Sequence, residues 1–90
     1  MLVEANIGIA RSYAEKYLLL GWAVICPHMN YAHMDDLGYE LLLAADMELI
    51  RRCDVIVMLP NWKRSNGAMR EHAFAKKLKK EIIYEGGQIP

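Results

Sequence analysis

Residues 54–71 read Asp-Val-Ile-Val-Met-Leu-Pro-Asn-Trp-Lys-Arg-Ser-Asn-Gly-Ala-Met-Arg-Glu. Residues 55–59 are five consecutive apolar residues, ended by Pro60, which is typical of a strand buried on both faces. Such strands belong to parallel sheets. Turn-forming residues follow at 61–67, and the composition becomes helical from Ala68. The stretch therefore predicts a strand, a loop and a helix, and ligands of open α/β sheets bind at such loops.

The start of this predicted helix carries candidate ligand-binding residues. Ser65, Asn66 and Gly67 stand where unpaired backbone N–H groups and the positive end of the helix dipole favour an anion. Glu71 lies about one turn further along the helix. The alternative interpretation is structural, with Ser65 acting as an N-cap and Glu71 as a favourable acid near the helix start.

Length and composition limit the class of protein. Ninety residues predict one domain, 1–90, and no apolar run approaches the roughly 20 residues of a membrane span. Eleven basic residues balance eleven acidic ones, so no global charge favours nucleic acid. Cys26 and Cys53 lie beside apolar segments, as buried free thiols of cytosolic proteins do. We expect a soluble cytoplasmic protein that binds neither membranes nor nucleic acid.

The rest of the chain predicts alternating helices and strands. We expect a helix at 3–20 ended by Gly21, a helix at 37–52 capped by Asp36 and a helix at 67–79. Strands are predicted at 22–26, 55–59 and 82–84. The sequence thus indicates an α/β protein with a parallel sheet and helices on both faces. No strand is predicted before the first helix.

A second polar segment, residues 27–36, follows the predicted strand 22–26. Because the carboxyl ends of parallel strands lie on one rim, this segment should face the 61–67 loop. It supplies His28 and Tyr31 as candidate substrate-binding residues. Tyr31 and Trp62 are placed to stack on a base from the two facing loops, although Trp62 could instead close over the core.

Metal binding is not expected. His28 and His33 lie near Cys26, but their spacing fits no recognised zinc pattern. We therefore predict no metal and no cofactor.

Several motifs together resemble the nucleoside 2-deoxyribosyltransferase-like superfamily, nearest to its small bacterial and phage proteins. The resemblance covers about residues 4–84. The motifs are Asn6-Ile7 with Ala10-Arg11, Gly21-Trp22-Ala23-Val24-Ile25-Cys26-Pro27-His28, Asp46 ahead of Cys53-Asp54-Val55, and Ser65-Asn66-Gly67-Ala68 leading to Glu71.

The resemblance implies a fold and an activity. Members are flavodoxin-like three-layer α/β domains, usually dimeric or larger, that cleave the N-glycosidic bond of 2-deoxyribonucleosides or their monophosphates. Glu71 matches the family's nucleophile and Asp46 its aspartate partner near base and sugar. Ser65 matches the phosphate-binding serine of the nucleotide hydrolase branch. The implied partner is a small-molecule nucleoside or nucleotide.

One feature of the superfamily is not found in the sequence. Members begin with a central strand that ends in a Gly-Pro-Tyr or Gly-Pro-Phe loop, between the strands matched by residues 22–26 and 55–59. We therefore expect a flavodoxin-like sheet with its N-terminal strand missing. The resulting gap must be filled by a partner chain or by a rearranged sheet order, and we expect a homodimer.

The chemistry of the candidate residues leaves three classes of function open. Base displacement needs one carboxylate and one carboxyl acid, and Glu71 and Asp46 qualify. We expect Glu71 to be charged, Asp46 to be partly protonated, and their carboxyls to lie about 5 to 9 Å apart. The alternatives to a glycosidase or transferase are a non-catalytic nucleotide-binding protein and a structural fragment with an empty pocket.

Overall fold

The computed structural model describes residues 1–4, 9–31 and 33–87. Strand β1 (Leu2–Val3), strand β2 (Val55–Met58) and strand β3 (Glu81–Tyr84) form one sheet in the order β1-β2-β3. Both pairs are parallel, with Leu2 opposite Val57 and Val57 opposite Ile83. The predicted α/β class with a parallel sheet is confirmed, and the arrangement is consistent with a flavodoxin-like fold.

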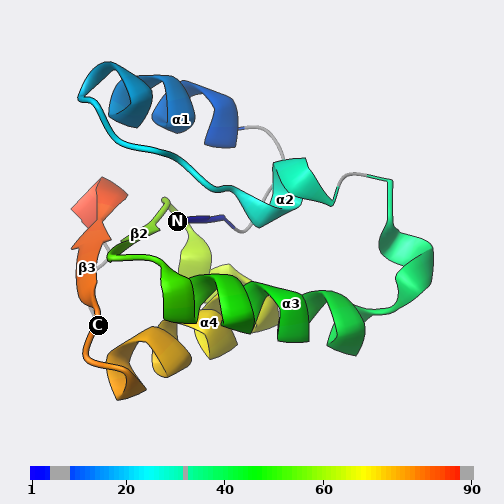
Figure 1. Ribbon diagram of the computed structural model, residues 1–90. Helices are drawn as coiled ribbons and strands as arrows, with labels where there is room; N and C mark the ends of the chain where they lie inside the picture. Colours follow the sequence, from blue (N-terminus) through cyan, green and yellow to red (C-terminus); the bar gives the residue numbers. More distant parts are fainter. Residues whose placement is uncertain (5–8, 32, 88–90) are drawn as a thin grey trace.

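Helices cover both faces of this sheet, as predicted. Helix α1 (Ala10–Leu19) lies on one face, and helices α3 (Tyr39–Arg52) and α4 (Asn66–Lys77) lie together on the other (Figure 1). The short helix α2 (Pro27–Asn30) and three 3-10 turns, η1 (Asp35–Leu37), η2 (Trp62–Arg64) and η3 (Glu85–Gly87), complete the described elements. None of the helices in these ranges is long and apolar enough to cross a membrane.

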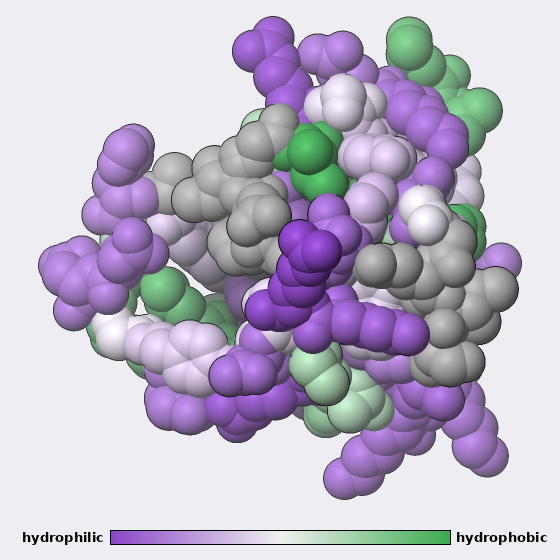
Figure 2. All heavy atoms as spheres, turned by 180° about the vertical axis from the view of Figure 1, so that it is seen from behind, coloured by the Kyte–Doolittle hydropathy of each residue, from purple (hydrophilic) through white to green (hydrophobic). Residues whose placement is uncertain are grey.

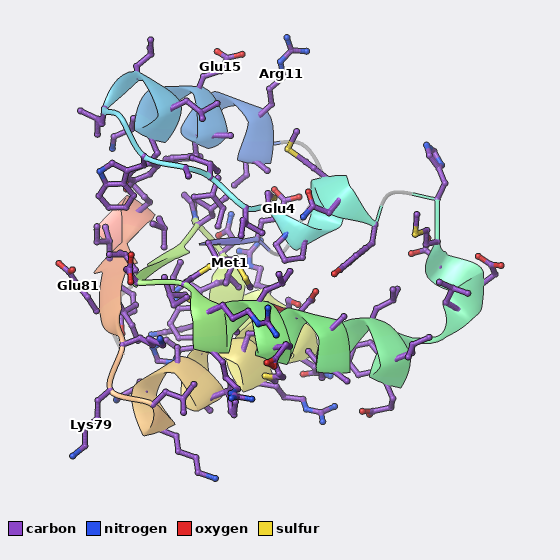
Figure 3. All side chains as sticks on the ribbon, in the orientation of Figure 1. Met1, Glu4, Arg11, Glu15, Lys79 and Glu81 are labelled. Carbon is purple, nitrogen blue, oxygen red and sulfur yellow. The ribbon has the colours of Figure 1, made fainter. Side chains whose placement is uncertain are left out.

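Alternating side chains of the strands build two hydrophobic clusters. Ile56 and Met58 point to the α3 and α4 face, whereas Val57 and Leu59 point to the α1 face, and all four are fully buried. This is the reason why the apolar run at the centre of the sequence has no polar alternation. Polar side chains such as Arg11 and Glu15 project from α1 away from the sheet (Figure 3).

The expectation of a missing first strand is wrong, and so is the helix predicted from residue 3. Leu2 and Val3 form β1, and the β2 amides of Val57 and Leu59 donate to the carbonyls of Met1 and Val3. Leu2 and Val3 belong to opposite clusters, and each is 2% exposed. Only an extended backbone sends adjacent side chains to opposite faces, so the tertiary pairing overrides the short helical pattern.

The first strand lies between β2 and segment 22–26. The amide of Leu2 donates to the carbonyl of Ile25 at 2.8 Å, so β1 bridges the two segments that we expected to flank a gap. The predicted gap in the sheet is therefore closed by residues of the chain itself. The structural-fragment interpretation loses its premise for the same reason.

Segment 22–26 is not a strand, which corrects a second expectation. Because β1 is only two residues long, just one backbone hydrogen bond, from Leu2 to Ile25, ties this segment to the sheet among the described residues. A single bond does not make a ladder. The segment nevertheless runs beside the sheet and delivers residues 27–36 to its carboxyl rim.

The predicted helix cap at Gly21 is confirmed, and the one predicted at Asp36 is wrong. Gly21 has φ +91°, and the amides of Gly21 and Trp22 donate to Leu18 and Tyr17, which is the predicted glycine C-cap. Asp36 does not cap α3. It lies in η1, and Gly38, with φ +95°, occupies the N-cap position because the chain needs a positive φ to turn into the helix.

Candidate functional site

A cleft of about 500 Å³ opens at the carboxyl rim of the sheet, between α3, α4 and the segment after α2. The two loops expected to face each other both contribute to it, through Tyr31 from residues 27–36 and Ser65 and Gly67 from the α4 start. The lining side chains are otherwise mostly apolar or aromatic. The full lining is Pro27, Tyr31, His33, Asp35, Tyr39, Leu42, Leu43, Asp46, Ser65, Gly67, Ala68 and Glu71.

Two carboxyl groups from different helices meet in this cleft. Asp46 comes from α3 and Glu71 from α4, two helices that pack against each other. Each carboxyl acts on the pKa of the other as a hydrogen-bonding neighbour, so the two groups lie close together in the cleft. Two carboxyls can share a hydrogen bond only if one of them is protonated.

Burial determines which carboxyl holds the proton. Glu71 is only 7% exposed, and burial, followed by the charge and hydrogen bond of Asp46, raises its pKa to about 8. Burial also raises the pKa of Asp46, to about 6, while the hydrogen bond from Glu71 opposes this rise. Near pH 7 the shared proton therefore lies on Glu71 and the charge on Asp46.

This distribution reverses the expected protonation of the pair. We placed Glu71 near the positive end of the helix dipole, but it is the sixth residue of α4, beyond the first turn where the dipole acts. Desolvation therefore dominates. Asp46 is half-buried and keeps the charge, and apart from the Glu71 carboxyl its buried oxygen Oδ1 has no hydrogen-bond partner within the described part of the chain.

Ser65 is the N-cap of α4. Its Oγ accepts a hydrogen bond from the Ala68 amide at 3.1 Å, and its carbonyl accepts from Met69 at 2.9 Å. The structural interpretation of Ser65 is therefore confirmed. Because Ser65 and Gly67 also line the cleft, the same turn that starts the helix brings its amides to the site.

Tyr39, which lines the cleft, contacts Arg70 of α4. The guanidinium of Arg70 lies 5.8 Å from the centre of the Tyr39 ring and donates to Glu40 at 3.0 Å. A Cβ placed on Gly67 would lie 3.5 Å from the Tyr39 hydroxyl. The tyrosine ring therefore covers the start of α4 from the side of α3.

Two other candidate residues, Trp62 and Asn66, are not part of the cleft lining. Trp62 is 3% exposed and packs on His72, with ring centres 4.3 Å apart, and on Tyr84. It closes over the core, as in the alternative interpretation, and does not offer a face to a base. Asn66 is exposed outside the lining. The His28 side chain and Asn6-Ile7 lie outside what the structure describes.

Sequence analysis missed several lining residues. Tyr39, Leu42 and Leu43 precede Asp46 by seven, four and three residues, so they share one face of α3 with it. This helical spacing, counted back from Asp46, was the signal that could have identified them. Asp35 and His33 had no such signal, because they lie in the irregular segment before the helix.

Glu4 is a further buried acid. It follows β1 and is 1% exposed, and burial raises the pKa of its carboxyl. Figure 3 shows Glu4 between α1 and α2, and it is not part of the cleft lining.

Metal coordination has no support in the described ranges. They contain no group of three or more His, Cys, Asp or Glu side chains that could hold a metal ion. Cys26 and Cys53 are free thiols, as expected, with Cys26 buried and Cys53 half-buried.

Comparison with known proteins identifies a domain without assigning an activity to it. Residues 3–84 match the family model described as "Domain of unknown function (DUF4406)". No curated protein and no solved structure matches the chain.

Proposed function

The chain belongs to the DUF4406 family, and from the geometry of its cleft we propose that it cleaves the N-glycosidic bond of a nucleoside or nucleotide, or transfers the 2-deoxyribosyl group. The observation that carries this proposal is the hydrogen-bonded pair of Asp46 and Glu71 in a mostly apolar cleft. The resemblance to the nucleoside 2-deoxyribosyltransferase-like superfamily supports the same roles, with Glu71 as nucleophile and Asp46 as its partner.

A pair that holds one proton and one charge has what both roles require. For attack on C1′, the proton passes from Glu71 to Asp46 along their hydrogen bond. The Glu71 carboxylate then bonds to C1′ while the C1′–N bond breaks. The electron pair of the C1′–N bond leaves with the base, and the base takes the proton from Asp46. Water or a second base then attacks C1′ and gives its proton to the Asp46 carboxylate, and the bond to Glu71 breaks to restore the Glu71 carboxylate. The pair again holds one proton and one charge.

One structural detail supports a ligand in this cleft. Tyr31, Tyr39 and the leucines of α3 supply an apolar wall of the kind that contacts a base or a sugar face.

The proposal predicts a bell-shaped pH dependence. Below about pH 6 both carboxyls hold protons and no nucleophile forms, and above about pH 8 both are ionised and no acid remains for the base. Base release from deoxynucleosides and their monophosphates, followed by chromatography, should therefore give a kcat/KM maximum between these values. A profile without either limb between pH 5 and 9 would contradict the shared-proton assignment.

The second candidate function is nucleotide binding without chemistry. It needs only the cleft and the amide groups at the start of α4, and the N-cap geometry of Ser65 favours it. Saturable binding of a nucleoside or nucleotide without base release from any compound of the panel would select this function over the first.

We also propose that the protein is a homodimer. Leu18, Leu19, Leu20 and Trp22 expose large apolar side chains around the end of α1, and Leu19 is 88% exposed. Figure 2 shows hydrophobic side chains gathered at this end of a mostly hydrophilic face. A second copy would remove this patch from water, as stable interfaces of roughly 1,000 Å² or more do.

Sedimentation should give a dimer at concentrations of roughly tens of micromolar, a range in which specific interfaces associate. Leu19→Lys should shift the protein toward monomer, because it places a charge in the apolar contact. Met34→Lys, which changes an exposed apolar residue in the segment before η1, is the matched control and should remain dimeric. A monomeric wild type at these concentrations would refute the proposal.

A further inference from the structure

We infer that the cleft selects a nucleoside without a 5′-phosphate over the corresponding monophosphate. This inference rests on the proposed function and names the substrate class for it. It starts from the charges of the lining. Three lining side chains are acids, Asp35, Asp46 and Glu71, and none of the lining residues in the described ranges is Lys or Arg.

The undescribed positions do not change this balance. Residues 5–8, 32 and 88–90 are Ala, Asn, Ile, Gly, Ala, Gln, Ile and Pro, so they add no charged side chain. The acids of the lining are therefore not balanced by a lysine or arginine of the described ranges.

The guanidinium that contacts the lining residue Tyr39 is already engaged. Arg70 donates to Glu40 at 3.0 Å and lies over the ring of Tyr39, and it is not part of the lining. To bind a phosphate it would have to leave both partners. The ion pair of Arg70 and Glu40 is exposed to solvent. Its two opposite charges largely cancel each other's effect on a ligand in the cleft.

The start of α4 does not compensate for the acids. Ser65 Oγ accepts from the Ala68 amide and the Ser65 amide donates to Trp62, which leaves the amides of Asn66 and Gly67. The helix dipole contributes about half a positive charge. Against it stand the acidic side chains of the lining, so a phosphate dianion meets net repulsion while an uncharged nucleoside does not.

The remaining lining favours the same ligand. Apolar and aromatic side chains cover the cleft between the acids, and a base with an unphosphorylated sugar can contact them without losing the hydration of a dianion. The acids then act as hydrogen-bond acceptors for sugar hydroxyls rather than as repelling charges.

The test compares 2-deoxynucleosides with their 5′-monophosphates at pH 7.5, measuring base release by chromatography and binding by calorimetry. We expect kcat/KM and affinity to be at least tenfold higher for the nucleoside at low salt, and the ratio to shrink as salt screens the repulsion. A kcat/KM and an affinity for the monophosphate that equal or exceed those for the nucleoside overturn the inference and leave the proposed function standing. Neither release nor binding of either compound overturns both.

Two neighbouring aspartates provide a matched pair of variants. Asp35→Asn removes a charge from the cleft lining, whereas Asp36→Asn removes the same charge from the next residue of η1, outside the lining. Asp35→Asn should raise kcat/KM for the monophosphate severalfold relative to kcat/KM for the nucleoside. Asp36→Asn should leave the ratio of the two kcat/KM values unchanged. Equal shifts from both variants, or none from Asp35→Asn, would overturn the role of cleft charge.

Discussion

Replacing Glu71 by glutamine is expected to lower base release by at least about a thousandfold, because the amide cannot form a bond to C1′ and cannot pass a proton to Asp46. Glutamine has nearly the same shape and can keep one hydrogen bond to the Asp46 carboxylate through its NH₂ group. Glu71 is only 7% exposed, so a substitute must keep the shape of its side chain if the protein is to fold normally. The loss should therefore appear in kcat and not in folding.

Binding measurements separate this chemical effect from a structural one. Calorimetry with the unreacted deoxynucleoside should give a dissociation constant for Glu71→Gln within severalfold of the wild-type value. Glu48→Gln is the matched control, since Glu48 is a glutamate of α3 that pairs with Arg51 and Arg52 at the surface. Wild-type turnover by Glu71→Gln would refute the assignment of Glu71 as the nucleophile. A large loss of base release in Glu48→Gln would show that the assay reports protein stability.

The strands and helices that could be predicted are those with long, regular patterns. The apolar run at 55–59 identified the central strand, and the glycine after the first helix identified its end, because both signals are local. The first strand could not be predicted in this way. Leu2 and Val3 are too few to show a period, and only their pairing with β2 determines their conformation.

Segment 22–26 illustrates the opposite error. Its composition is typical of a strand, but a strand is defined by its neighbours, and β1 offers it a single backbone hydrogen bond. Local sequence contains no information about the length of the neighbouring strand. β1 lies between segment 22–26 and β2, where the resemblance places the superfamily's first strand and where we expected a gap.

The residues of the candidate site could be predicted from the sequence, but their protonation could not. Spacing and resemblance selected Asp46, Ser65 and Glu71, and all three line one cleft. The protonation of the pair could not be read from the sequence, because it depends on how deeply α3 and α4 bury each carboxyl. Trp62 was misplaced for a similar reason, since only the packing against His72 shows that it belongs to the core.

The buried pair should also make the folded protein less stable as the pH rises. The pKa of Glu71 is raised from 4.5 to about 8 on folding, and that of Asp46 from 3.8 to about 6. The folded state therefore binds more protons than the unfolded state between these values. By linkage, the free energy of unfolding falls with pH across this window, and it levels off above about pH 8.

We expect the wild type to lose about 3 kcal/mol of unfolding free energy between pH 5 and pH 9 relative to Glu71→Gln, because a shift of one pKa unit corresponds to about 1.4 kcal/mol and partial water access reduces the full value. Urea denaturation of both proteins at the two pH values measures this difference. The variants should be similarly stable at pH 5, where Glu71 is neutral, and Glu71→Gln should be the more stable at pH 9. Parallel pH dependences in the two proteins would mean that Glu71 ionises as easily in the folded state as in the unfolded chain, and the shared proton, on which both the proposed chemistry and the pH profile depend, would not exist.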